Sequence, residues 1–113
     1  MHEMSIVQSL ISIVEEEMLK NNATILKSVR VKIGKMSGIV PEALSTCFEI
    51  LTSRTDMKGA VLKMDIAPLI AHCRKCNQDF EVIEYNFSCP ECDSTDIDVI
   101  SGREMNIVEI EVD

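Results

Sequence analysis

The sequence has no tryptophan and few other aromatic residues, which together make up 4% of its 113 positions. A core built from this composition must be filled by aliphatic side chains and by the seven methionines. The sequence also lacks any apolar run approaching the roughly 18 residues that a bilayer-spanning helix requires. No basic stretch followed by an apolar block stands near its start, so we expect neither a secretion signal nor membrane association.

Basic residues are also scarce. The chain has 11 Lys and Arg against 19 Asp and Glu, which gives a formal net charge of −8. A surface this acidic repels phosphate backbones, and the basic patch typical of nucleic-acid-binding proteins is missing. The charge instead favours cations or a basic protein as binding partners.

The usual catalytic motifs are absent as well. The chain has only two histidines, His2 and His72, and contains no H-E-x-x-H motif and no glycine-rich phosphate loop. No Ser-His-Asp arrangement and no recognisable pair of acid–base carboxylates stands out. The sequence therefore gives little support for an enzyme, and we expect no catalytic residues.

Cysteine is the residue whose spacing is informative. Four of the five cysteines form two C-x-x-C pairs, Cys73 with Cys76 and Cys89 with Cys92. Two such turns facing each other complete a tetrahedral thiolate cage, which suits Zn²⁺ and leaves no open position for catalysis. An iron tetrathiolate would use the same ligands. Two unrelated redox pairs would instead require a thioredoxin-like βαβ setting, which the sequence lacks. Cysteines in metal spacing also indicate a reducing cytoplasm rather than a disulfide framework.

Two segments have the apolar spacing of amphipathic helices. The first runs from Ser5 to Lys20, and its apolar face comprises Val7, Leu10, Ile11, Val14 and Met18. The second begins at Pro41, a residue suited to the first helical position, and its apolar face comprises Leu44, Cys47, Phe48 and Leu51. The fifth cysteine, Cys47, lies in this stripe without a His or basic residue nearby. We expect it to be a buried small side chain rather than a nucleophile.

Three segments alternate apolar and polar residues as half-buried strands do. Their apolar positions are Val29, Val31 and Ile33, then Leu62, Met64 and Ile66, and finally Val108, Ile110 and Val112. The pattern predicts an α+β fold, with a small mixed three-stranded sheet covered by two helices and an inserted zinc-ribbon lobe. Residues 1–69 together with 101–113 should form the α/β body, and residues 70–100 the zinc-binding lobe.

The first three residues, Met1, His2 and Glu3, form a potential metal chelate. The bulk of His2 should prevent removal of Met1, which leaves a free α-amine, one peptide nitrogen and then an imidazole. Three nitrogens in a plane, with a fourth ligand from the Glu3 backbone or carboxylate, suit the tetragonal geometry that Ni²⁺ and Cu²⁺ favour. Three residues alone are weak grounds for such a site.

Several segments, taken in order, resemble the HypA/HybF nickel metallochaperones of hydrogenase maturation. They are M-H-E at the start, the helix M-S-I-V-Q-S-L-I-S-I-V-E-E-E, the segment V-R-V-K-I-G-K-M-S-G-I-V-P-E-A-L, and C-R-K-C with C-P-E-C. The resemblance covers nearly the whole chain. It implies that His2 is the essential nickel ligand, supported by the Met1 amine and Glu3. It also implies that Cys73, Cys76, Cys89 and Cys92 bind a structural zinc.

The resemblance further implies transient Ni(II) binding in the α/β body and delivery to the [NiFe]-hydrogenase large subunit, together with the nickel-binding GTPase HypB. Some members of the family also serve urease. The family includes different oligomeric states, so a monomer and a homodimer both remain open. His72, directly before Cys73, could compete for the zinc, although a plain surface role is favoured. The alternative hypothesis is a zinc-ribbon adaptor that binds protein or RNA, with an inert N-terminus.

Overall fold

The computed structural model describes residues 2–113 of the chain. These residues form two compact units that are interleaved in sequence. The first, the helical unit, comprises residues 2–32, 38–65 and 106–113; the second, the cysteine unit, comprises residues 33–37 and 66–105. The cysteine unit therefore extends beyond residues 70–100, and the functional division drawn from the sequence stays a prediction.

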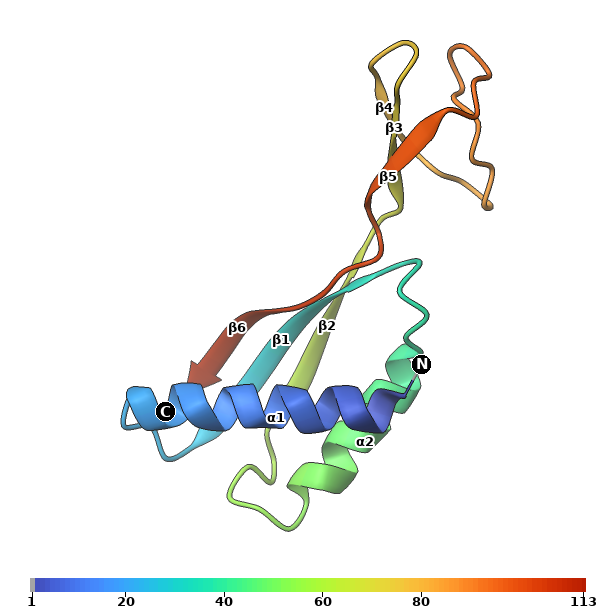
Figure 1. Ribbon diagram of the computed structural model, residues 1–113. Helices are drawn as coiled ribbons and strands as arrows, with labels where there is room; N and C mark the ends of the chain where they lie inside the picture. Colours follow the sequence, from blue (N-terminus) through green and yellow to red (C-terminus); the bar gives the residue numbers. More distant parts are fainter. Residues whose placement is uncertain (1) are drawn as a thin grey trace. The chain divides into compact units, whose positions relative to one another are not determined.

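The helical unit contains two helices and a three-stranded sheet in the order β2-β1-β6. Its elements are α1 (Glu3–Lys20), β1 (Leu26–Gly34), α2 (Pro41–Thr52), β2 (Val61–Ala67) and β6 (Met105–Val112). Figure 1 shows α1 crossing the strands on one face of the sheet, with α2 packed against α1. The predicted α+β fold is thereby confirmed.

The core of the helical unit is aliphatic, as the composition requires. Val7, Leu10 and Val14 recur on one face of α1 and are buried. They are joined by Val29 and Val31 from β1 and by Leu44 and Phe48 from α2. The predicted helix starts two residues earlier than expected, at Glu3, because His2 acts as its N-cap and its carbonyl accepts the N–H of Ile6. Cys47 is half-buried rather than fully buried.

The cysteine unit contains a second sheet, formed where the sequence predicts short extended segments around Ile70 and Phe80 and by one further strand. Its strands are β3 (Ile70–Cys73), β4 (Asp79–Glu81) and β5 (Ile97–Ser101), in the order β4-β3-β5 and antiparallel throughout. The fully buried apolar cluster of this unit contains only Leu69, Ala71 and Val82. Partly buried residues packed around it are Met36, Phe80, Phe87, Ile97 and Val99.

Two glycines allow backbone segments to approach closely within the cysteine unit. Gly34 donates its N–H to the carbonyl of Glu104, and Gly102 accepts the N–H of Met36. A Cβ on Gly34 would collide with the backbone of Gly102, and one on Gly102 would collide with Leu69. Gly102 also has φ +117, which few residues with a side chain adopt. Among residues 2–113, no helix has both the length and the apolar content to cross a membrane.

Candidate metal centres

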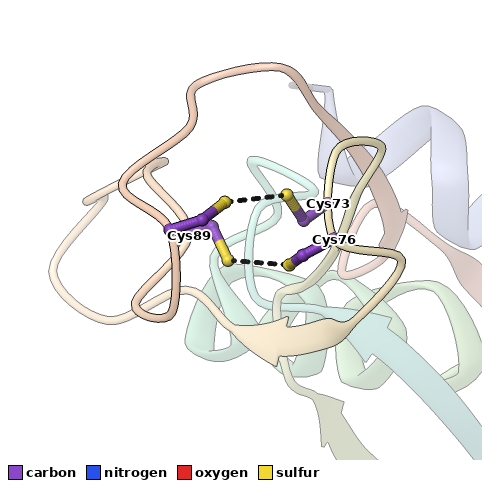
Figure 2. A group of neighbouring side chains, drawn as sticks. Cys73, Cys76 and Cys89 are labelled. Atoms are coloured by element: carbon purple, nitrogen blue, oxygen red, sulfur yellow. Dashed lines mark hydrogen bonds between the residues drawn. The ribbon is translucent and has the colours of Figure 1, made fainter.

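The four paired cysteines come together in the cysteine unit. Their sulfurs all lie within 4.8 Å of one another. Across the pairs, Cys73 Sγ is 3.6 Å from Cys92 Sγ, and Cys76 Sγ is 3.5 Å from Cys89 Sγ. Figure 2 shows Cys73 and Cys76 facing Cys89 from the opposite turn.

These separations fit a zinc tetrathiolate. A Zn–S bond of about 2.3 Å places tetrahedral sulfur ligands about 3.8 Å apart, so the cluster needs only small adjustments to close on the ion. Four sulfur ligands complete the coordination shell, and the cluster therefore suits a structural zinc. Bound zinc would link the two C-x-x-C turns.

The two C-x-x-C turns share one backbone design. In the first, Cys73 accepts the N–H of Asn77 and donates its own N–H to Gln78. In the second, Cys89 accepts the N–H of Asp93 and donates to Ser94. Asn77 (φ 58) and Asp93 (φ 60) both adopt the left-handed conformation, which Asn and Asp tolerate better than other residues with a side chain.

The sulfurs differ in acidity. The backbone N–H of Cys76 donates to the sulfur of Cys73 and lowers the pKa of the Cys73 thiol to about 6. The hydrogen bond to Cys89 raises the pKa of the Cys76 thiol to about 12. Cys73 is therefore a thiolate near neutral pH without a metal, whereas Cys76 must release a proton when a metal binds.

Arg74 connects the first C-x-x-C turn to β5. Its Nε donates to Asp98 Oδ2 at 2.9 Å, its Nη2 also contacts Asp98, and its Nη1 donates to Asp96. The two-point contact with Asp98 fixes the direction of the guanidinium. All three side chains are about half exposed, so water screens the charges and the contact serves orientation more than stability.

His72 lies outside the sulfur cluster. It is on β3 opposite Asp79 of β4, and its Nδ1 is 2.6 Å from Asp79 Oδ1. This cross-strand pair occupies one imidazole nitrogen. The geometry is that of a surface polar pair and not of a fifth metal ligand.

The predicted nickel residues lie at the start of the helical unit, and Met1 is outside the described residues. The His2 side chain is exposed and makes no capping hydrogen bond to α1. Glu3 Oε2 accepts the backbone N–H of Val40 at 3.2 Å, which joins the first residue of α1 to the N-cap of α2. This hydrogen bond lowers the pKa of the Glu3 carboxyl below its ordinary value.

The sequence pattern did not identify several residues that shape these sites. Asn77 and Asp93 carried a usable signal, because Asn and Asp directly after each C-x-x-C pair favour a left-handed turn. The contact of Val40 with Glu3 carried none, since it joins positions 37 residues apart through a backbone group.

Comparisons with known proteins agree with this geometry. The family model described as "Hydrogenase/urease nickel incorporation, metallochaperone, hypA" matches residues 1–112. The hydrogenase maturation factor HypA of Solidesulfovibrio magneticus is 38% identical over 117 residues, covering 100% of both chains. That of Campylobacter jejuni is 38% identical over 111 residues, covering 97% of each.

Solved structures give the same result. The solution structure of the Ni metallochaperone HypA from Helicobacter pylori has a TM-score of 0.71 and 29% identity, covering 99% of this chain and 97% of that one. A second solution structure of a HypA protein has a TM-score of 0.77 and 29% identity, covering 99% and 96%. These matches confirm the resemblance found in the sequence.

Proposed function

The chain belongs to the HypA family of nickel metallochaperones, and we propose that it binds Ni(II) at its N-terminus and delivers it for maturation of a [NiFe]-hydrogenase. Urease is the alternative client that the family description names. Proteins of this family are maturation factors and not enzymes. Nickel is thus a cargo, and the chain needs a site that both selects it and releases it.

The proposed nickel ligands are the Met1 amine, the His2 peptide nitrogen and the His2 imidazole. Amine and peptide nitrogen close a five-membered chelate ring, and peptide nitrogen and imidazole Nδ1 close a six-membered ring. Planar nitrogen ligation favours Ni²⁺ over Zn²⁺. Ligands on an exposed chain end also leave the ion accessible to the protein that receives it.

The observation that carries this proposal is the position of His2 and Glu3. Because the His2 carbonyl is held by the first turn of α1 while its side chain stays exposed, the imidazole is free to turn toward a metal. The Glu3 carboxylate is already used by Val40, so it acts as a positioning group. We infer that the Glu3 backbone, and not its carboxylate, provides the fourth ligand.

In this proposal Cys73, Cys76, Cys89 and Cys92 hold a structural zinc. Residues 1–69 together with 101–113 form the nickel-binding body, and residues 70–100 present a rigid surface that zinc stabilises. The partners would be the GTPase HypB and the hydrogenase large subunit, with the chain as a monomer or homodimer. We place the exchange in the cytoplasm, where cysteine ligands stay reduced.

The test is nickel titration of untagged, zinc-loaded protein by calorimetry. His2→Ala should weaken nickel binding by at least about 100-fold, because even the outer partners of metal ligands contribute up to that much. Acetylation of the Met1 amine should have a similar effect, since it removes one of the three nitrogens from the chelate. The matched control is His72→Ala, which removes the other histidine and should leave nickel affinity unchanged.

Zinc content measured on the same samples separates the two metals. All variants should keep one zinc per chain, which shows that loss of nickel binding is not loss of the fold. Nickel affinity that survives both His2→Ala and acetylation of the Met1 amine would refute the N-terminal site. It would leave the adaptor hypothesis, which predicts partner binding without nickel.

A further inference from the structure

A groove lies along one edge of the sheet in the helical unit. Strand β6 lies at the outside of the order β2-β1-β6, and Figure 1 shows its end beside the last turns of α1. A groove of about 550 Å³ runs between these two elements. Its apolar lining includes Ile13 and Met18 from α1 and Val108, Ile110 and Val112 from β6.

The groove follows the edge of β6 and not one of its faces. Consecutive residues of a strand point to opposite faces, yet Ile107, Val108, Glu109 and Ile110 all line it. A surface that touches both sets of side chains must run along the strand edge, where unpaired backbone N–H and C=O groups are presented. Ile13 is 49% exposed and Val108 56% exposed, so apolar surface remains open to a partner.

The charges at this edge are negative. Glu17 and Glu109 are the only ionisable residues lining the groove within residues 2–113. Glu17 is 3.6 Å from Lys20, whereas Glu109 and the neighbouring Glu111 make no ion pair in the described part of the chain. The edge therefore combines backbone hydrogen-bonding groups, apolar contacts and uncompensated carboxylates.

We infer that the outer edge of β6, with the adjoining α1 groove, binds an extended segment of a partner protein in which apolar residues alternate with Lys or Arg. The segment adds a fourth strand beside β6. Its apolar side chains contact Ile13 and Val108, and its basic side chains face Glu109 and Glu111. The chemistry of the segment follows from the charge and from the spacing of residues along the edge.

A second copy of this chain is a poor occupant. Residues 105–112 contain two glutamates and no basic residue, so pairing β6 with another β6 brings like charges to one edge. The same carboxylates protect the edge against self-association. The occupant must supply the positive charge.

The groove is also remote from the nickel end of the helical unit. Glu3 and Glu17 are 14 positions apart on α1, which corresponds to about 20 Å along a helix. A partner bound at β6 therefore leaves the N-terminal ligands free to load and release nickel. The inference does not depend on the nickel site, because neither His2 nor Glu3 takes part in it.

The probe is a synthetic peptide of alternating lysine and valine, added to ¹⁵N-labelled, zinc-loaded, full-length protein. We expect chemical-shift changes centred on residues 105–112 and slower hydrogen exchange of outer β6 amides. Glu109→Lys should weaken binding about tenfold, because it replaces an attractive surface pair by a repulsive one. Glu109→Gln should give an intermediate loss.

The matched control is Glu81→Lys, which makes the same charge change on β4, an edge strand of the other sheet. It should change the affinity less than about twofold, since Glu81 does not line the groove. A second peptide with proline at its centre should bind much more weakly, because proline removes a ladder hydrogen bond.

Three results would overturn the inference. One is equal weakening by Glu81→Lys and Glu109→Lys, which would show that only net charge matters. Another is equal affinity for the proline peptide, which would exclude strand addition. The third is self-association of the chain at micromolar concentration through the β6 amides.

Discussion

Different interactions stabilise the two units of this chain. The helical unit buries a continuous aliphatic set from two helices and a sheet, including side chains such as Val7, Val31 and Leu44 with no exposed surface. The cysteine unit has three buried residues in its apolar cluster and four sulfurs within 4.8 Å of one another. A core that small rarely stabilises a fold unaided, so the second unit depends on its metal and the first does not.

The comparison also fits the division of the two metals that we propose. The cysteine unit uses four ligands from two turns, which leaves no vacant position and makes the ion part of the fold. The nickel ligands that we propose at the exposed end of the helical unit could be lost while the core stays intact. Binding that can be reversed without unfolding is what a carrier of nickel requires.

The largest predicted effect is that of removing zinc. Structural zinc sites contribute about 10–16 kcal/mol of apparent binding free energy, which here becomes folding free energy of the cysteine unit. Chelation should collapse the amide spectrum of residues 66–105 while residues 2–32 keep their dispersion. Cys76→Ser should do the same, whereas Cys47→Ser, outside the cluster, should retain zinc. Simultaneous loss of both units would show that they fold as one.

The next largest effect is predicted for the core of the helical unit, which should be stable without a metal. Leu44 has no exposed surface, so Leu44→Ala leaves a cavity and should cost about 4 kcal/mol of unfolding free energy. Urea unfolding followed by circular dichroism measures it. The control is Ile50→Ala on the same helix, where the side chain is 57% exposed and the cost should stay below about 0.5 kcal/mol. Zinc content should be unchanged in both variants.

Close backbone packing gives a third, smaller effect. Gly34→Ala places a methyl group against the backbone of Gly102, which cannot move aside as a side chain can, and should cost about 2 kcal/mol. Gly38→Ala is the control, because a Cβ there meets no atom within 4 Å. Its φ of +81 alone should cost about 1 kcal/mol. Equal losses in thermal unfolding would mean that the contact with Gly102 carries no cost.

Arg74 tests whether the zinc site depends on groups other than sulfur. Arg74→Gln removes the contacts with Asp96 and Asp98, and because they are half exposed the loss should be about 1 kcal/mol or less. We expect faster zinc release to a chromophoric chelator, with unchanged stoichiometry. Arg54→Gln changes the same charge at an exposed position of the helical unit and should leave the release rate unaffected.

The smallest effect concerns the Glu3 hydrogen bond. The pKa of the Glu3 carboxyl is lowered in the folded chain. The hydrogen bond to Val40 is therefore fully present above the pKa that Glu3 has in the unfolded chain, and it is lost as the pH falls through the pKa of the folded chain. The Val40 amide resonance should therefore titrate below the range of an ordinary glutamate. In Glu3→Gln this titration should vanish. A Val40 resonance that is unaffected in both cases would show that the bond is absent in solution.

Patterns local in sequence predicted much of this molecule. The repeat of Val7, Leu10 and Val14 follows helical spacing, and C-x-x-C turns form from neighbouring residues whatever surrounds them. Strand β5 was missed because it has only five residues. Its two exposed positions are one acid, Asp98, and one apolar residue, Ile100, so the polar–apolar alternation is too short to distinguish a strand from a loop. It becomes a strand by pairing with β3, a partner more than twenty positions earlier.

Contacts between backbone and distant side chains were beyond reach for a related reason. Every residue except proline has a backbone N–H, so nothing in the sequence marks the N–H of Val40 as the partner of Glu3. The early start of α1 instead depends on a local contact, the hydrogen bond from the Ile6 N–H to the His2 carbonyl, which the repeat of apolar residues does not mark. Both features lie at the proposed nickel site. There the sequence predicted the ligands but not the hydrogen bonds that position them.

Strand β6 is the last element of the chain, and it pairs with β1 near the beginning. During synthesis the cysteine unit, complete at residue 105, has all of its residues available before the helical unit does. The helical unit must wait with an open strand edge on β1 until the final eight residues have left the ribosome. A chain truncated before those residues would therefore contain every residue of the cysteine unit, but its helical unit would lack the third strand and leave one edge of β1 unpaired.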